Sequence, residues 1–182
     1  MNLKRIFKYY YFHEDLNIIY LNKIAKVKNI SVIFDQKNSD FKLKNNFLRA
    51  INFCKKEKIS YYFINDFKLA VKYKAKGIYL KSNYKLTIRR GIYNIDIIGS
   101  AHNQLEYFFK KRQQCKVIML SPIFENMKYT KNKILNINRF NLIASKWETE
   151  VSALGGINYS NIKKIRMTKS KGVGFSRFIE TI

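Results

Sequence analysis

The 182-residue sequence contains one proline, seven glycines, two cysteines and two histidines, and its 12 acidic residues face 36 basic ones. No proline-, glycine- or serine-rich linker divides the chain, so we expect one domain over residues 1–182. Cys54 and Cys115 cannot build a disulfide framework and have no Cys or His at zinc-site spacing, which favours a reduced, cytoplasmic protein. No apolar run approaches the roughly 18 residues of a spanning helix, and the N-terminal segment lacks the apolar stretch of a signal peptide. We therefore expect neither a membrane protein nor a secreted one.

The formal net charge of +24 has two interpretations. A basic surface attracts phosphate, which favours nucleic acid or an anionic ligand as the partner. However, 99 of the 182 residues are Lys, Asn, Ile, Tyr or Phe, the residues that AT-rich codons encode. Arginine, which nucleic-acid-binding proteins favour for bidentate contacts, occurs only eight times. We interpret most of the charge as codon bias and do not expect nucleic-acid binding.

Short apolar runs rich in β-branched and aromatic residues alternate with amphipathic or charged stretches. The runs lie at 6–12, 30–34, 59–64, 77–80, 95–99, 116–120, 150–154 and 171–175. This composition is typical of buried strands, and helical patterns lie between them at 42–57, 103–112 and 159–168. The alternation predicts an α/β protein, a compact single (β/α)8 TIM barrel, with an open flavodoxin-like sheet as the alternative. Apart from Ser176, only residues 177–182 follow the last run, so we expect the last helix to be truncated or absent.

In such a barrel, the residues directly after each strand carry the function. Asn65 and Asp66 follow the third run, where the Asp66 carboxylate can either hold Mg²⁺ on a phosphorylated substrate or cap the next helix. Ser100 and His102 follow the fifth run and precede a helix. Helix N-termini bind anions, and a histidine there can transfer protons, although Ser100 and Asn103 can also serve only as caps.

The loops after the last three runs contain further candidates. The sixth is followed by Ser121, the only proline and a polar loop that includes Lys128. The seventh is followed by Gly155 and Gly156, a pair that lets backbone N–H groups approach a phosphate closely. Ser176 follows the eighth run, and the last two loops often bind phosphate in barrels.

The segments INDFKLA, AKGIYL, IGSAHNQLE, LSPIF, RFNLIA and VSALGGIN, in this order and spacing, resemble the thiamine phosphate synthases and their TenI-like relatives over residues 30–180. The resemblance implies a barrel that joins hydroxymethylpyrimidine diphosphate to a thiazole phosphate with Mg²⁺, releasing diphosphate. It implies Asp66 as metal ligand and catalytic residue, Lys128 as a catalytic loop lysine, and His102 as the proton-transfer residue of a TenI-like tautomerase. It implies substrate contacts from Lys37, Asn65, Ser100, Ser121, Gly155, Gly156 and Ser176.

Two segments depart from the family pattern. Members usually carry Gln-x-Arg-x-Lys after the second strand; here the segment is Ile33–Lys37, with Asp35 in place of the arginine and only Lys37 retained. After the fourth strand, the usual His-x-Gly-Gln-x-Asp is replaced by Tyr79–Tyr84, which has no carboxylate. We therefore expect weaker Mg²⁺ binding, and we hypothesise that Lys81 offsets part of the diphosphate charge.

Three functions remain open from the sequence: a divergent synthase, a TenI-like thiazole tautomerase, and a non-catalytic barrel that binds a phosphorylated ligand. A missing last helix would leave an apolar strip between the first and eighth strands, and such a strip would favour a homo-oligomer.

Overall fold

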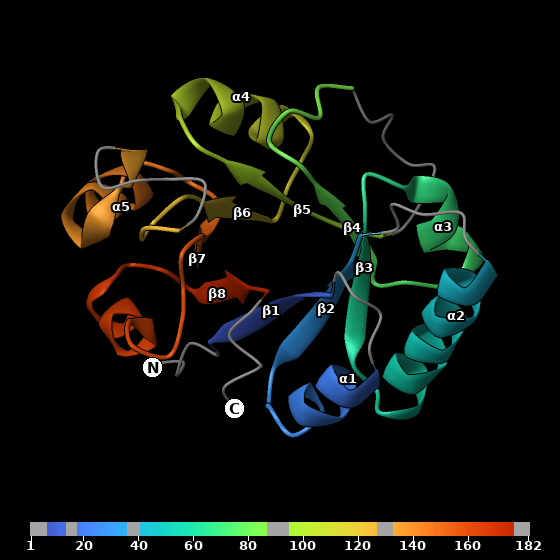
Figure 1. Ribbon diagram of the computed structural model, residues 1–182. Coiled ribbons are helices and arrows are strands. Elements are labelled where there is room, and N and C mark those ends of the chain that lie inside the picture. The colour runs from blue at the N-terminus through green and yellow to red at the C-terminus, as the bar shows by residue number, and fades with distance from the viewer. Residues whose placement is uncertain (1–6, 14–17, 36–40, 87–94, 127–132, 177–182) are drawn as a thin grey trace, which may run out of the picture.

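The computed structural model describes residues 7–13, 18–35, 41–86, 95–126 and 133–176, and its strands form one closed parallel barrel in chain order (Figure 1). The strands are β1 (Lys8–His13), β2 (Ile30–Phe34), β3 (Ser60–Ile64), β4 (Gly77–Leu80), β5 (Asp96–Ala101), β6 (Val117–Leu120), β7 (Glu150–Leu154) and β8 (Gly172–Phe175). Each lies within a residue or two of a predicted apolar run. The predicted TIM barrel is confirmed.

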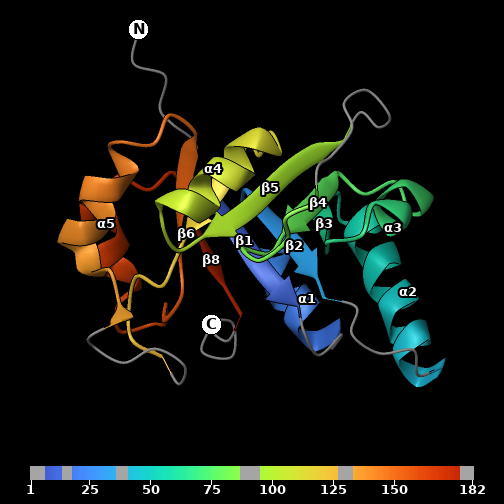
Figure 2. The same ribbon diagram turned by 90° about the horizontal axis from the view of Figure 1, so that it is seen from above.

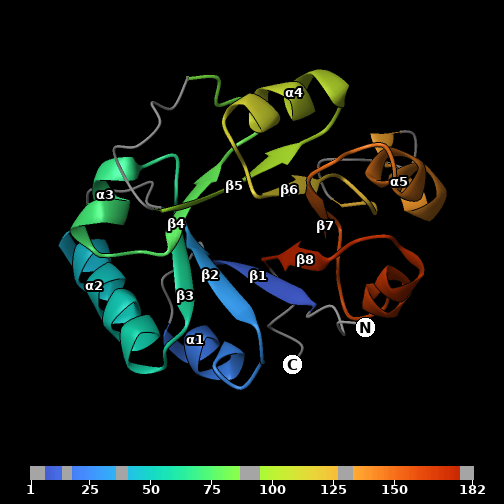
Figure 3. The same ribbon diagram turned by 180° about the vertical axis from the view of Figure 1, so that it is seen from behind.

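Helices surround the strands on the outside of the barrel, and α5 lies on the side opposite α2 and α3 (Figures 1, 2 and 3). They are α1 (Ile18–Ile24), α2 (Phe41–Lys56), α3 (Phe67–Lys72), α4 (Gln104–Arg112) and α5 (Asn136–Ala144). The helix predicted at 159–168 is instead a 3₁₀ helix, η2 (Ile162–Met167). The prediction of a truncated or absent last helix concerns residues 177–182, outside the described residues. None of the described helices is long and apolar enough to cross a membrane.

Residues alternate between the two faces of the barrel wall, because successive side chains of a strand point to opposite sides. The interior contains a cluster of Tyr10, Ile33, Tyr62, Tyr79, Ile98, Val117 and Met119. Their neighbours along the strands, such as Tyr11, Tyr61 and Ile118, belong to the larger core between the barrel and its helices. This two-residue repeat fixes which residues reach the barrel's two open ends.

The core outside the barrel is aromatic where α2 packs on β2 and β3. Phe34, Phe47 and Phe63 are each about 1% exposed, and their ring centroids lie 5.6–5.9 Å apart. The helical period of α2 places Phe47, Ala50, Ile51 and Cys54 on this buried side. The helix predicted at 42–57 is thus confirmed as α2.

The homo-oligomer expected from an apolar strip between β1 and β8 stays a prediction. At two outward-facing positions of these strands, the side chains are covered. Tyr11 on β1 and Phe175 on β8 pack 6.0 Å apart and are 2% and 5% exposed. At these two positions, the chain leaves no apolar surface for a partner subunit to cover.

His13, at the end of β1, gives the fold a pH dependence. Its ring is fully buried against Phe34, and its Nε2 has no hydrogen-bond partner among the described residues. Burial lowers the pKa of His13 from 6.5 to about 4. Between these two values the unfolded chain binds more protons than the folded chain, so stability falls as the pH falls through this range.

We expect the free energy of unfolding of the native chain to decrease by about 2 kcal/mol more than that of His13→Asn between about pH 7.5 and about pH 5. Urea unfolding followed by circular dichroism measures both chains at each pH. Equal pH dependence in the two chains would show that His13 is protonated equally when folded and unfolded.

Candidate active site at the carboxyl ends of the strands

Five polar side chains occupy inward-facing positions at the carboxyl end of the barrel, here called the mouth. Each lies two residues beyond an interior residue of its own strand, so the strand alternation directs it inward. They are Asp35, Lys81, Ser100, Ser121 and Ser176. Three of them, Ser100, Ser121 and Ser176, were predicted as substrate contacts. Ser100 and Ser121 are buried, whereas Ser176 is half-buried.

Asp35 and Lys81 form an ion pair across the end of β3. The Lys81 Nζ lies 3.1 Å from the Asp35 Oδ2, and the side chains are 39% and 14% exposed. Since β2 and β4 both neighbour β3, the pair spans one strand of the mouth. Asp35 therefore does not face a ligand as an isolated negative charge, and Lys81 keeps donors for a second partner.

Asn65 and Asp66 form the turn between β3 and α3. Asn65 adopts a left-handed backbone with φ of 54°, and its Oδ1 accepts a hydrogen bond from the Lys81 N–H at 3.0 Å. The Asp66 Oδ1 accepts from the Leu69 N–H at 2.8 Å and caps α3. The capping interpretation of Asp66 is thus confirmed, and among the described groups none donates a hydrogen bond to its Oδ2. Its metal role remains a prediction.

A magnesium site at Asp66 would have to rely on the substrate for most of its ligands. Among the described residues, no three His, Cys, Asp or Glu side chains gather in a group that could hold a metal ion. Mg²⁺ commonly binds through one or two carboxylates together with substrate phosphates and water. A single carboxylate oxygen that accepts from no described group is compatible with that mode.

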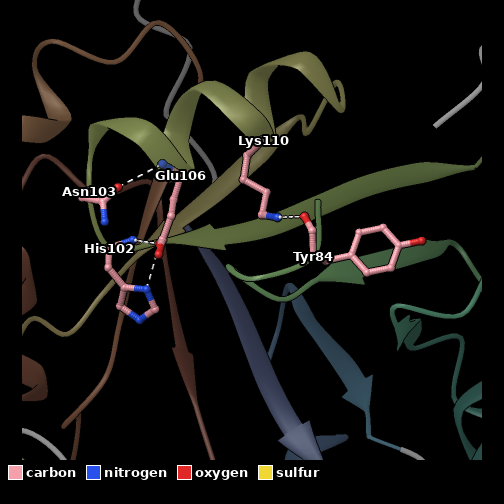
Figure 4. Close-up of polar contacts among 5 residues, drawn as sticks. All are labelled: Tyr84, His102, Asn103, Glu106 and Lys110. Atoms are coloured by element: carbon pink, nitrogen blue, oxygen red, sulfur yellow. Dashed lines mark hydrogen bonds and ion pairs between the residues drawn. The ribbon is translucent and has the colours of Figure 1, made fainter. Parts of the chain in front are cut away.

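At the end of β5, His102 is held by Glu106 of α4 (Figure 4). The Glu106 Oε2 accepts a hydrogen bond from the His102 N–H at 2.7 Å and lies 2.9 Å from Nδ1. Asn103 caps α4 by accepting from the Glu106 N–H at 3.0 Å, as predicted. The carboxylate fixes the imidazole ring beside the mouth, an arrangement that suits a proton-transfer residue.

Ser100 lies deeper in the same strand. Its hydroxyl is hydrogen-bonded to the Tyr79 phenol. Burial raises the pKa of Tyr79, so the phenol in this hydrogen bond is neutral.

The segment after β4 is anchored by α4, an interaction that the sequence analysis missed. Lys110 is fully buried, and its Nζ donates to the Tyr84 carbonyl at 2.8 Å (Figure 4). Gln113 donates to the carbonyls of Tyr84 and Leu86 at 3.0 and 2.9 Å. Burial lowers the pKa of Lys110. Together, these contacts fix the chain a few residues beyond Lys81.

The turn after β7 needs glycine at Gly155 and Gly156 for a structural reason, independent of any phosphate: the backbone of the loop after β6 passes close to both. Both have positive φ, 94° and 70°, and a Cβ on Gly156 would lie 2.3 Å from the Phe124 carbonyl oxygen. The Phe124 N–H donates to the Gly155 carbonyl at 3.1 Å, joining this turn to the loop after β6. Among the described groups, none accepts a hydrogen bond from the N–H of either glycine. The predicted phosphate cup requires N–H groups that have no such acceptor.

The remaining two predicted residues, Lys37 and Lys128, lie outside the described residues. Their contacts with the mouth therefore stay predictions.

The fold is a (β/α)8 barrel with polar side chains at the carboxyl ends of its strands. The family model for thiamine monophosphate synthase matches residues 13–179, and the chain belongs to that family. The family resemblance found in the sequence is thereby confirmed. No curated protein sequence matches the chain.

The similar solved structures agree with the fold. Thiamine phosphate pyrophosphorylase from Pyrococcus furiosus has a TM-score of 0.77 at 14% identity, covering 99% of this chain and 93% of that one. The enzyme of the same name from Bacteroides thetaiotaomicron has a TM-score of 0.56 at 19% identity, covering 93% and 82%. The YdjI aldolase from Escherichia coli K12 has a TM-score of 0.63 at 9% identity, covering 95% and 76%. At these identities, the likeness establishes the barrel and not the reaction.

We expect Gly156→Ala to lower the free energy of unfolding by about 2 kcal/mol, because the new Cβ collides with backbone and the positive φ is strained. Urea unfolding measures the loss. Unchanged stability would show that the Phe124–Glu125 backbone adapts freely. The same collision means that Gly156→Asp would disturb the loop whether or not a phosphate binds there.

Proposed function

We propose that this chain is a transferase of the thiamine phosphate synthase type, which joins hydroxymethylpyrimidine diphosphate to a thiazole phosphate. The observation that supports the proposal is that two groups of candidate residues lie at one mouth. Asp66 and Lys81 follow β3 and β4, and Gly155 and Gly156, whose N–H groups donate to no described group, follow β7. Strands β3 and β7 are opposite one another in the ring. Two phosphorylated substrates bound there would bring their organic ends together over the centre of the barrel.

The proposed reaction needs its charges at these positions. The C–O bond of the pyrimidine methylene breaks, and both electrons leave with the diphosphate oxygen. The thiazole nitrogen then donates its lone pair to the methylene carbon, which forms the new C–N bond. Lys81 donates hydrogen bonds to the departing diphosphate, and Ser100 contacts it from β5. Mg²⁺ held by Asp66 would offset the remaining charge of the diphosphate.

Water must be kept from the cationic carbon, because it would compete with the thiazole nitrogen. The other inward positions next to the mouth are apolar: Phe12, Ile64 and Leu154 pack against the interior cluster. Phe12 contacts Tyr79 edge-on, with ring centroids 5.1 Å apart. This apolar floor gives the reacting atoms a surface that offers no hydrogen bond to water. Lys37 and Lys128 are proposed to contact the substrates from the loops that follow β2 and β6.

A TenI-like thiazole tautomerase is the second candidate, favoured by the His102–Glu106 pair. A histidine oriented by a carboxylate can remove a proton from one ring position and return it to another. This reaction needs the Gly155–Gly156 cup but no metal carboxylate. Both functions place the thiazole phosphate at β7 and β8, so the assays below separate them by product.

We expect the native chain to form thiamine phosphate from the two substrates with Mg²⁺, and Asp66→Asn to form it about 100-fold more slowly. Asparagine caps a helix as well as aspartate, so this variant keeps α3 but loses the negative charge. Thiochrome fluorescence measures the product. An equal rate in native chain and variant would contradict the metal role of Asp66.

The matched variant Asp66→Ala separates capping from catalysis. It removes both the charge and the cap, so we expect the rate loss of Asp66→Asn together with a lower stability of about 1 kcal/mol. If the native chain makes no thiamine phosphate but interconverts thiazole tautomers in a His102-dependent way, the tautomerase replaces the synthase.

We expect Lys81→Gln to raise the KM for the pyrimidine diphosphate by about tenfold or more, because a charge-assisted hydrogen bond to the diphosphate is lost. The KM for the thiazole phosphate should stay near its native value, since that ligand binds across the ring. Lys55→Gln is the control: it removes the same charge from an exposed position in the last turn of α2. Equal effects of the two variants would reduce the role of Lys81 to general charge.

A further inference from the structure

The barrel has a second polar cavity at its opposite end, where the strands begin. This amino-end cavity has a volume of about 280 Å³ and is lined by the first residues of β1, β2, β3, β5 and β6. The two small side chains Ser31 and Ser60 face inward there, at paired positions of β2 and β3. The interior cluster around Ile33, Tyr79 and Met119 separates this cavity from the mouth. A ligand of the amino-end cavity would therefore bind independently of the proposed reaction.

Two tyrosines form the inner wall of the amino-end cavity. Tyr10 and Tyr62 are 3% and 4% exposed and both line the cavity. Among the described groups, none accepts a hydrogen bond from either phenol. Asp96 and Glu150, at the beginnings of β5 and β7, act on the Tyr10 hydroxyl electrostatically, and Asp96 acts on that of Tyr62. The hydroxyls therefore point toward the amino end and into the cavity.

Both phenols are donors at neutral pH. Burial raises the pKa of Tyr10 and of Tyr62, and the nearby carboxylates raise them further. Neither hydroxyl oxygen is fully buried, since the fully buried polar side-chain atoms without a partner among the described residues are those of His13, Thr149 and Ser152. Both phenols can therefore donate a hydrogen bond to an acceptor that enters the cavity.

The charged groups around the cavity leave an excess of donors. Each carboxylate already has a lysine: the Lys8 Nζ lies 3.0 Å from Glu150, and Lys116 is paired with Asp96. Lys76 also lines the cavity, and no carboxylate pairs with it among the described residues. The local charge is therefore positive. Because neither acid is left without a lysine, the cavity suits an anion better than a cation.

We propose that the amino-end cavity binds a small oxyanion, either inorganic phosphate or the phosphate group of a monoester. Such a group presents several oxygen acceptors to the phenols of Tyr10 and Tyr62 and to the hydroxyls of Ser31 and Ser60. Lys76 at the rim supplies the unpaired charge. No residue of the mouth takes part, so this proposal is independent of the transferase proposal.

The test is a titration of ¹⁵N-labelled chain with inorganic phosphate, and separately with glycerol 3-phosphate, at ionic strength held constant with sodium chloride. We expect saturable shifts of the amide signals of Ser31, Ser60 and Asp96. A second set of shifts at Asn65, Lys81 and Gly156 would report the mouth and is fitted separately. Tighter binding of inorganic phosphate assigns the cavity to the free ion, and tighter binding of the ester assigns it to a phosphorylated metabolite.

Adjacent residues of β3 supply a matched pair of variants. Tyr62→Phe removes one inward hydroxyl from the cavity and keeps the ring, so we expect affinity at the amino-end signals to fall roughly tenfold. Tyr61→Phe removes the hydroxyl of the preceding residue, which points outward and donates to the Tyr73 carbonyl at 2.6 Å. We expect its phosphate affinity to equal that of the native chain. Lys76→Gln, an exposed change that spares the core, should weaken binding severalfold.

Three results would overturn the proposal. The first is amino-end shifts that never saturate, or that sodium chloride alone reproduces, which would reduce them to general screening of a charged surface. The second is equal phosphate affinity of Tyr62→Phe, Lys76→Gln and the native chain. The third is saturable binding at the mouth signals alone.

Discussion

The constraint on which the whole structure depends is the inward alternation of eight short parallel strands. Closure of the ring forces every second residue into an interior that only side chains can fill. This chain fills the middle with Tyr10, Tyr62, Tyr79 and aliphatic residues, and it places polar residues at both ends. The interior cluster therefore separates the two polar ends of the barrel, which are built from the same strands. A change of one residue in register would exchange the mouth for the outer core.

A chain of 182 residues builds the barrel with few supporting elements. Where β4 leads toward β5, residues 81–86 form no helix in the part of the chain that is described, and side chains of α4 take over the anchoring. Lys110 serves this role with its ammonium group buried against a carbonyl. Because the hydrogen bonds that reach this segment from Lys110 and Gln113 go to backbone carbonyls, the contact depends on the path of the chain and not on which side chains follow Lys81.

Local sequence patterns were sufficient for the strands, for α2, for the Asn103 cap and for the candidate motifs after each strand. They were not sufficient for contacts between strands. Asp35 and Lys81 were recognised as two separate departures from the family pattern, and only the closed ring shows that they neutralise one another across β3. The collision at Gly156 depends on the loop after β6, which no local pattern places. Lys110 looked like any of the many solvated lysines, since burial leaves no trace in a single residue.

The lysines of the chain are of two kinds, those on solvated faces and those with a fixed acceptor. Most lysines lie on solvated faces, where composition explains them and where salt screens them. A few have fixed acceptors inside the architecture: Lys81 at the mouth, Lys8 and Lys116 at the amino end, and Lys110 beneath the β4 segment. A lysine with a fixed acceptor has a defined direction, and specific recognition of a phosphate requires direction as well as charge. In the Asp35–Lys81 pair, an aspartate follows the strand that in family members usually carries the arginine, and a lysine follows the strand that usually carries the carboxylate. The pair keeps one charge of each sign there but exchanges the strands that carry them.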